Sequence, residues 1–470
     1  MGSTAPLGTS TGQAGPLTGT HLVTKPDLIP LNRSEHMYWA GEGYLGSISE
    51  AFMLRFDGPV DTDLIRQALH ELVMAYPRMR GVIESTGLSY QMRILSDALH
   101  IDQLFAHAFQ VQQGVDASSR ASLETFHNGF INEAISLERG MPWRARLIPH
   151  PTQPALMLSV HHIIGDGRSV IQMLCAIMAR LSGEPIKPCK VDSHSMLPAA
   201  MPLKWWHWPA SITRWWRQTQ ADKQAAQGLN IVSLRRRSST RYTTTSVKYH
   251  ELACPADTMK ALAKAQGTTV NTLLSVVIAN TFLAMAADDP KAAARLRIAI
   301  DLRRYFPEGT APDFGNFVFS FPVVAQRLPT LQAQIASIEG QVKHHLARCE
   351  HRDYALPLLF YELIPLLGRT MFSYLILRSK AKNALPPLSC FLTNLGSADF
   401  INPKAATTRM TEFWPTTLST AFLIAALSLN GKQLLTLTSQ DDEIPPEAVQ
   451  AFRAELDVQI SALMTPTPAA

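Results

Sequence analysis

The sequence predicts an α/β (α+β) protein with two lobes, on three observations. The 470 residues are too many for one ordinary hydrophobic core. Apolar residues recur at every second position in some stretches and at every third or fourth position in others, and the two patterns alternate in both halves of the chain. A stretch rich in proline and tryptophan separates the halves. We therefore expect strands and helices in each of two lobes, joined by an irregular crossover.

These patterns divide the chain into five segments. The first, residues 1–25, is a flexible tail of Gly, Ser, Thr and Pro that lacks the basic-then-apolar layout of a signal peptide. The others are an N-terminal lobe at 26–185, a crossover at 186–245, a C-terminal lobe at 246–465 and a short tail at 466–470.

The N-terminal lobe opens with a predicted strand at Glu50–Gly58 and an amphipathic helix at Thr62–Ala75. Asp61 is placed to cap the start of this helix and Pro77 to stop it. Two more strands and a helix follow at Trp143–Pro149, Ala155–Val160 and Gly167–Leu181.

The C-terminal lobe repeats the order of strand and helix. The expected helices are Ala256–Ala265, Val270–Ala286, Leu328–Arg348 and Pro446–Leu463, and the expected strands are Val247–Cys254, Arg297–Leu302, Phe317–Ala325 and Gln433–Gln440.

The composition excludes several classes of function. A formal net charge of +5 is a mild excess, which suits an anionic partner such as coenzyme A, an acidic carrier protein or anionic lipid, but it is not the basic stripe of a nucleic-acid-binding protein. The five cysteines are scattered without a C-x-x-C pair, which favours a cytoplasmic compartment. The apolar stretches Leu356–Leu367 and Met371–Leu377 fall short of the roughly 20 residues that cross a bilayer, so no integral membrane protein is expected.

The strongest chemical signal is the segment His161–Gly167, which reads HHIIGDG and follows a predicted strand. A neutral imidazole removes a proton from an alcohol or amine as that group attacks a carbonyl, which is general-base catalysis. His162 is the candidate base. His161 and Asp166 suit roles that hold the ring in one orientation, and Gly167 lets the next helix begin close to the site.

Two other interpretations of this segment exist. Two histidines at the end of a strand can simply satisfy local hydrogen bonds, and a bare His-His pair would favour that interpretation, but the full seven-residue pattern reverses the preference. A metal site is the other interpretation. Neighbouring residues of a strand point to opposite faces and no motif supplies a third ligand, so no metal is expected.

The segment resembles the signature of the superfamily that includes chloramphenicol acetyltransferase, nonribosomal-peptide condensation domains, plant BAHD acyltransferases, wax ester synthases and polyketide-associated acyltransferases. HHIIGDG matches H-H-x-x-x-D-G at every fixed position. Looser matches follow in the usual order over most of the chain: LNRSEHMYWA, AYPRMR, RIAIDLRRYFP, DFGNFVFSF and LSCFLTNLG. The resemblance implies two chloramphenicol-acetyltransferase-like lobes in a V, with a central substrate tunnel at the catalytic histidine.

The same resemblance implies roles for single residues. His162 is the general base, and Asp166 is structural and pairs with an arginine of the second lobe, for which Arg303 is the candidate. An acyl-CoA, or an acyl group on the phosphopantetheine of a carrier protein, enters one mouth of the tunnel, and a small-molecule acceptor enters the other. No permanently bound cofactor is implied.

Two segments of the C-terminal lobe extend the candidate site. Asp313–Asn316 resembles the DFGWG motif of the plant branch, but Asn316 replaces the tryptophan, which argues for a microbial branch. Gly315 and Asn316 are candidates for lining the tunnel, and a plain turn before the next strand is an equal alternative. The oxyanion of a tetrahedral intermediate also needs a donor. The candidates are Ser389, Thr393 and Asn394.

The crossover contains LKWWHWPASITRWW, in which Trp205, Trp208, Ile212 and Trp215 stand at helix-like spacing near cations. Aromatic rings beside Lys and Arg suit peripheral contact with a membrane, and a lid helix packed on the protein itself is the alternative. We favour the lid, because Pro209 interrupts the helix and large aromatics commonly anchor crossovers.

Three functions fit the sequence. The first is a freestanding acyltransferase that forms an ester from acyl-CoA or an acyl carrier protein. The second is a freestanding condensation enzyme that releases a carrier-bound polyketide or peptide chain onto an amine or alcohol, with the carrier acting in trans. The third is a non-catalytic binding or scaffold module, which the presence of His162 disfavours. We expect a cytoplasmic monomer.

Overall fold

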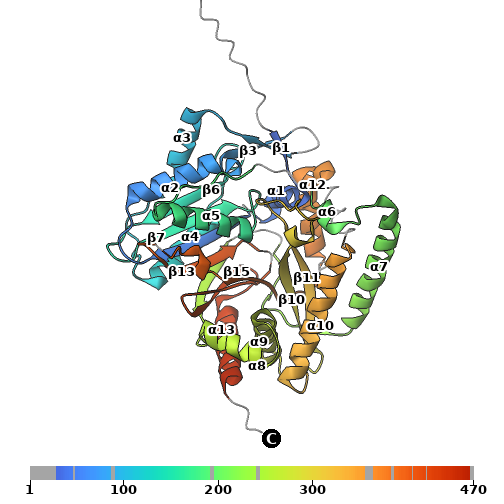
Figure 1. Cartoon of the computed structure of the whole chain (residues 1–470). Coiled ribbons are helices and arrows are strands. Elements are labelled where there is room, and N and C mark those ends of the chain that lie inside the picture. Colours follow the sequence, from blue (N-terminus) through green and yellow to red (C-terminus); the bar gives the residue numbers. More distant parts are fainter. Residues whose placement is uncertain are drawn as a thin grey trace, which may run out of the picture.

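The computed structural model describes residues 28–45, 48–85, 90–190, 195–239, 244–354, 364–382, 386–404, 406–419 and 421–465. The predicted tails at 1–25 and 466–470 lie outside these residues. Helices and strands form two lobes, each around its own hydrophobic core (Figure 1). The predicted α/β class and the two-lobed organisation are therefore confirmed.

The N-terminal lobe is built on a mixed sheet with the strand order β13-β2-β7-β6-β5. Its central strands are antiparallel and buried along their whole length, so their side chains are mostly apolar on both faces. The strands are β2 (Ser49–Phe56), β5 (Phe109–Val111), β6 (Trp143–Ile148), β7 (Ala155–His161) and β13 (Met410–Thr417), and a small sheet holds β1 (Leu28–Pro30), β4 (Tyr90–Ile94) and β3 (Gly81–Ser85). The helices are α1 (Arg33–Leu45), α2 (Thr62–Ala75), α3 (Ala98–Ala108), α4 (Arg120–Asn132) and α5 (Gly167–Leu181).

The C-terminal lobe contains the larger sheet, with the order β11-β10-β12-β14-β15-β9 and β8 paired to β10. The strands are β8 (Asn230–Ile231), β9 (Thr245–Glu251), β10 (Ala292–Asp301), β11 (Val318–Gln326), β12 (Cys390–Ser397), β14 (Leu423–Leu429) and β15 (Lys432–Gln440). The helices are α6 (Leu197–Ala200), α8 (Ala256–Ala265), α9 (Val270–Ala284), α10 (Leu331–Glu350), α12 (Ile364–Ala381) and α13 (Pro446–Met464).

The predicted boundary between the lobes needs one correction. Strand β13 falls within the segment assigned to the C-terminal lobe, yet it pairs with β2 of the N-terminal sheet over Met410–Thr417. Strand β2 pairs with β7 on one edge, and its other edge would carry unpaired backbone groups if β13 did not bond to them. A linear division of the sequence cannot reveal such an exchange of a strand.

Helix α2 begins and ends as predicted, because Asp61 accepts a hydrogen bond from the backbone of Asp63 at 2.8 Å and Pro77 starts a separate 3-10 turn. Helix α5 also matches its predicted range. Strand β10 begins five residues before the predicted Arg297. Its first five residues are three alanines, an arginine and a leucine, which the alternation pattern does not mark as a strand.

The crossover is more regular than the sequence suggested. It contains the 18-residue helix α7 (Trp208–Ala225), in which Pro209 lies within the first two positions. Proline is tolerated there because the first N–H groups of a helix have no partner within the helix, so Pro209 does not interrupt α7. Trp215 packs against the C-terminal core, as a lid would, but Trp205, Trp206 and Trp216 are exposed.

Among the described residues, no single helix is long and apolar enough to cross a membrane. Helices α8 and α9 reach that length and composition only together, with a bend of 94° between them.

Candidate active site

His162 lies where β7 ends beside β2. Its backbone N–H donates to the carbonyl of Ile48 at 2.9 Å, which extends the antiparallel pairing one residue beyond β7. Because successive side chains of a strand point to opposite faces, His161 and His162 leave the sheet in opposite directions. The two adjacent imidazoles therefore have different surroundings and different roles.

His161 is fully buried and held at both ring nitrogens. Its Nε2 lies 3.0 Å from a carboxylate oxygen of Glu42 on α1, and its Nδ1 accepts a hydrogen bond from the backbone of Ile163 at 3.1 Å. These contacts fix the turn that follows β7, so the geometry fits the supporting role expected of His161.

The ring of His162 is buried to 7% exposure and held from four sides. It stacks on Tyr38 of α1, with ring centroids 4.4 Å apart. Its Nδ1 lies 2.9 Å from the carbonyl of Gly165 and 3.0 Å from the side-chain nitrogen of Asn316, while its Nε2 lies 3.3 Å from Glu50. Burial lowers the pKa of His162 to about 4, so the ring is neutral at neutral pH, as a general base must be.

Asp166 is the N-cap of α5. One of its carboxylate oxygens accepts from the backbone N–H and the hydroxyl of Ser169 at 3.0 and 3.1 Å. The other accepts from Arg303 at 2.8 Å and from the backbone of Phe317 at 2.8 Å. All four hydrogen bonds hold the turn and the helix start in place, so Asp166 is structural in this geometry.

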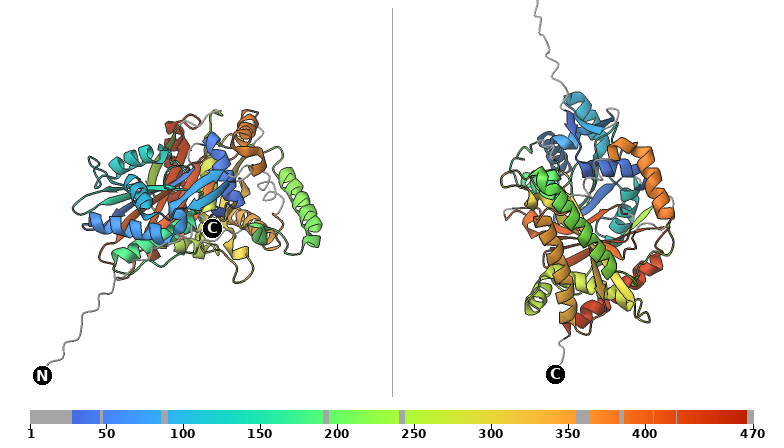
Figure 2. Two further views of the ribbon diagram at one scale, coloured as in Figure 1. Left: turned by 90° about the horizontal axis from the view of Figure 1, so that it is seen from above. Right: turned by 90° about the vertical axis from the view of Figure 1, so that its right-hand side faces the viewer.

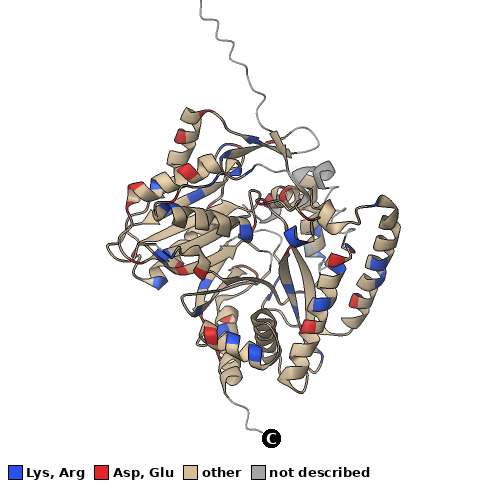
Figure 3. Cartoon of the chain, in the orientation of Figure 1, with Lys and Arg blue, Asp and Glu red and all other residues tan. Residues whose placement is uncertain are grey.

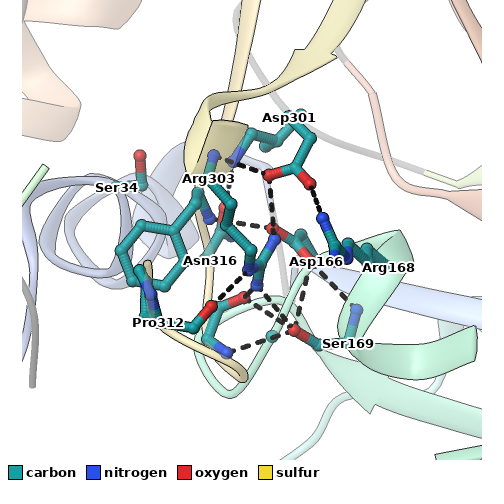
Figure 4. A network of polar contacts seen from close by, with 12 residues as sticks. Ser34, Asp166, Arg168, Ser169, Asp301, Arg303, Pro312 and Asn316 are labelled. Atoms are coloured by element: carbon teal, nitrogen blue, oxygen red, sulfur yellow. Dashed lines mark hydrogen bonds and ion pairs between the residues drawn. The ribbon is translucent and has the colours of Figure 1, made fainter. Parts of the chain in front are cut away.

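Arg303 supplies the ion pair expected from the second lobe, and it is 3% exposed. It lies in the 3-10 turn after β10 and also donates to the carbonyls of Pro312 and Gly315 at 3.1 and 2.7 Å and to Ser169 at 3.0 Å. Figure 4 shows this network, which reaches the surface through Asp301 and Arg168. Arg303 thus ties the C-terminal lobe to the His161–Gly167 turn.

The Asp313–Asn316 segment supports the site directly and is more than a turn. Gly315 has φ = 127°, which strongly favours glycine, and its carbonyl accepts from Asp166, Ser169 and Arg303. The side-chain nitrogen of Asn316 donates to the backbone carbonyl of His162 at 2.9 Å. Both predicted residues therefore reach the histidine segment from the other lobe.

Gly167 starts α5 in a confined place, since a Cβ on it would lie 3.4 Å from a methyl of Leu395 on β12. The expected oxyanion candidates Thr393 and Asn394 precede Leu395, so their strand passes the start of α5. Asn394 is hydrogen-bonded to Asn271 at 3.3 Å, and the roles of Thr393 and Asn394 stay predictions.

Ser389 requires a correction. Its hydroxyl donates to the carbonyl of Val232 and accepts from the backbone of Arg295, which joins β12 to β10 and the segment after β8. The hydroxyl hydrogen is used there, so the geometry does not support an oxyanion role for Ser389.

Sequence reasoning missed three side chains at this site: Tyr38, Glu50 and Ser169. Glu50 was placed in the predicted strand but given no function, although a carboxylate in a buried strand of mostly apolar residues signals a polar site. Ser169 stands three residues after the capping Asp166, a spacing that indicates a shared cap. Tyr38 offers no comparable local signal.

A well-defined cavity among the described residues lies away from His162. It has a volume of about 440 Å³ and lies at the end of β2 opposite His162, and its lining includes Arg55, Arg409, Glu412 and Lys432. The tunnel implied by the resemblance stays a prediction. The described residues also contain no group of three or more His, Cys, Asp or Glu side chains placed to hold a metal ion.

Two curated relatives resemble parts of the chain. A probable non-canonical nonribosomal peptide synthetase, CymA of Salinispora arenicola, is 29% identical over 219 residues, which is 42% of this chain and 3% of that protein. A wax ester synthase/diacylglycerol acyltransferase 6 of Arabidopsis thaliana is 23% identical over 131 residues, 26% of this chain and 25% of that protein. The chain thus matches only a small part of either relative.

Solved structures resemble the fold over nearly the whole chain. The first condensation domain of the calcium-dependent antibiotic synthetase has a TM-score of 0.67 at 12% identity, and the match covers 94% of this chain and 98% of that structure. Polyketide synthase associated protein 5 from Mycobacterium tuberculosis has a TM-score of 0.60 at 14% identity, and the match covers 94% of this chain and 100% of that structure. These likenesses establish a shared fold.

The family model of the condensation domain matches residues 46–365, which contain the histidine segment, Arg303 and the Asp313–Asn316 turn. With two thirds of its length matched, and with the fold of solved members of the group, this chain belongs to the condensation-domain family.

Proposed function

We propose that this chain is an acyltransferase that moves an acyl group from a pantetheine thioester onto a hydroxyl and so forms an ester. The donor is coenzyme A or an acyl carrier protein acting in trans. One observation carries the proposal: a buried, neutral imidazole, His162, is held at the junction of two lobes by contacts from both. A cytoplasmic location and a monomeric state belong to the same proposal.

In the proposed reaction the acceptor oxygen attacks the thioester carbonyl while Nε2 of His162 takes its proton. The carbonyl of Gly165 accepts from Nδ1–H of the imidazolium, and the negative charge of Asp166 favours the charged ring. The tetrahedral intermediate then collapses. Its C–S bond breaks, and the proton passes from Nε2 to the sulfur, leaving one ester and one thiol.

A second candidate is a freestanding condensation enzyme that releases a carrier-bound chain onto an amine or alcohol. The match to the condensation-domain family and the likeness to a peptide synthetase favour it. The two candidates use the same imidazole chemistry, and they differ in donor and acceptor.

Incubation of the purified full chain with a panel of thioesters is expected to release thiol from one donor class. The panel contains acyl-CoAs of graded chain length and acylated carrier proteins, each supplied with mixed alcohols and amines. Mass spectrometry identifies the product. An ester supports the proposed function, whereas an amide formed only from carrier-bound donors supports the second candidate. Turnover that is equal in the His162→Ala variant would contradict both.

A further inference from the structure

Glu50 is a buried carboxyl group to which the proposed reaction gives no role. It lies on β2, diagonally across the strand pair from His162, so the two side chains leave the sheet on the same side. Its Oε1 lies 3.3 Å from Nε2 of His162, and its Oε2 has no hydrogen-bond partner among the described residues. Burying a carboxyl group is costly. The contact with Nε2 therefore calls for a role at the imidazole.

The other ring nitrogen of His162 has a partner in either protonation state. Nδ1 faces an acceptor, the carbonyl of Gly165 at 2.9 Å, and a donor, the amide nitrogen of Asn316 at 3.0 Å. The amide orientation is consistent with its second contact, to the carbonyl of His162 at 2.9 Å. Nδ1 is thus satisfied with or without its hydrogen, so the group at Nε2 decides the tautomer.

We propose that Glu50 is a positioning residue that sets the tautomer of His162, with a catalytic consequence that rests on the proposed function. Protonated Glu50 donates to Nε2, which places the ring hydrogen on Nδ1 toward Gly165. An acceptor hydroxyl that displaces Glu50 then meets a lone pair able to take its proton. Ionised Glu50 instead accepts the hydrogen of Nε2, Asn316 donates to Nδ1, and the ring no longer serves as a base.

The charges around the pair give the direction of the pH dependence. Burial and then the charge of Asp166 raise the pKa of Glu50 well above its ordinary value, and burial lowers the pKa of His162 to about 4. Other ionisable groups nearby are His161, which faces Glu42, and Arg303, which is paired with Asp166. Transfer should therefore fall as the pH drops through about 4, where the ring gains a proton, and fall again as the pH rises through the ionisation of Glu50.

The tautomer is measurable without a substrate. We expect the ¹⁵N chemical shifts of His162, in full-length protein labelled at histidine, to change from the Nδ1–H to the Nε2–H form as the pH rises. Glu50→Gln should keep the Nδ1–H form throughout, because a neutral amide donates to Nε2 and does not ionise. Glu42→Gln, which alters the carboxylate beside His161, is the matched control and should leave the change at His162 in place.

Two results would overturn this role of Glu50: a wild-type His162 that keeps one tautomer across the pH range, or a Glu50→Gln variant that still switches. The rate profile adds a separate check, since Glu50→Gln should lose the alkaline limb and keep the acid limb. If His162→Ala abolishes transfer while Glu50→Gln retains the alkaline limb, only the tautomer proposal fails. If His162→Ala transfers acyl groups normally, the proposed function fails and the NMR result still stands.

A second inference comes from an independent observation, the exposed aromatic residues of the crossover. Trp205, Trp206 and Trp216 are 70%, 57% and 56% exposed, and Leu203 beside them is 64% exposed. Helix α7 lies on the outer edge of the molecule (Figure 2), attached through Ser211, Arg214 and Trp215. We call Leu203, Trp205, Trp206 and Trp216 the tryptophan surface.

The charges around the tryptophan surface are basic. Residues 203–225 contain four cations, Lys204, Arg214, Arg217 and Lys223, and one acid, Asp222. Arg214 is paired with Asp353 at 2.9 Å and Asp222 with Arg348 at 2.8 Å, so the excess positive charge comes from Lys204, Arg217 and Lys223. Figure 3 shows basic residues along α7. Indole rings settle at the headgroup level of a bilayer, and cations beside them are attracted to anionic lipid. We infer that the tryptophan surface binds an anionic lipid membrane peripherally.

Cosedimentation of the full chain with phosphatidylcholine vesicles, with and without phosphatidylglycerol, tests this inference. We expect binding that requires phosphatidylglycerol and that weakens about tenfold or more when Trp205, Trp206 and Trp216 all become serine. Phe400→Ser, at a 62% exposed aromatic of the C-terminal lobe, is the matched control and should bind as the wild type does. Trp215 is left intact because it packs on the core. Absence of binding, or binding unchanged by the triple substitution, would overturn the inference and leave an acidic protein as the partner to test.

Discussion

The His162→Ala variant is expected to transfer acyl groups about 10²–10⁴-fold more slowly than the wild type, because it lacks the proposed general base. The fold should survive. The substitution deprives Gly165 and Asn316 of one contact each, while Asn316 keeps its hydrogen bond to the backbone of residue 162. Turnover number and thermal midpoint, measured on the same preparation with the donor that the thioester panel identifies, separate loss of chemistry from loss of folding.

His127→Ala is the matched control for this experiment. His127 is also fully buried, and burial lowers its pKa to about 3. Among the described side chains, its ring on α4 hydrogen-bonds only to the hydroxyl of Tyr249 on β9, at 2.7 Å. We expect it to cost stability and to change the turnover number far less than His162→Ala does. Equal losses of turnover in the two folded variants would show that burial of an imidazole, and not base catalysis, explains the result.

The Arg303→Ala variant is expected to lose about 3–5 kcal/mol of stability, the usual cost of removing one partner of a buried ion pair. Asp166 would keep its charge without its partner, and the carbonyls of Pro312 and Gly315 would lose donors. Arg303→Lys should recover little of this, since an ammonium group cannot reproduce the planar guanidinium group that reaches five partners at once. Chemical unfolding of the full chain measures the loss.

Arg168→Ala provides the comparison within the same network. Arg168 pairs with Asp301 at 2.6 Å, but its side chain is 64% exposed, so we expect its removal to cost no more than about 1 kcal/mol. Unfolding of Arg303→Ala and Arg168→Ala at the same denaturant concentration would mean that the ion pair between the lobes does not stabilise the His161–Gly167 turn.

Local chemistry made much of this structure predictable. The range of α2 followed from its apolar spacing, Asp61 and Pro77, and the range of α5 followed from the same spacing after Gly167. In both helices a capping residue directly precedes the apolar pattern, so the predicted first residue is the one at which the helix begins. The His161–Gly167 turn was predictable for a different reason, because a dense seven-residue motif carries its own geometry.

What the sequence could not reveal depends on contacts between distant segments. Glu50 approaches His162 only because β2 pairs with β7, and Asn316 reaches it only because the second lobe closes over the turn. The oxyanion prediction for Ser389 failed for a local reason, since its hydroxyl, just before β12, bonds the neighbouring backbone. Helix α7 was underestimated because proline stops a helix in its interior but suits its first turn.

Because β13 pairs with β2 of the N-terminal sheet, that sheet cannot be completed until β13 has been synthesised. A ribosome releases His162 roughly 255 residues before Thr417, and at about 5–20 residues per second this delay is on the order of 13–50 s. During that time β2, which pairs with β7 on one edge, lacks β13 on the other edge, and the exposed backbone groups of that edge can pair with a strand of another chain. A nascent chain of this kind should need shielding of this strand edge until Met410–Thr417 emerge, because β2 gains its second neighbour only then.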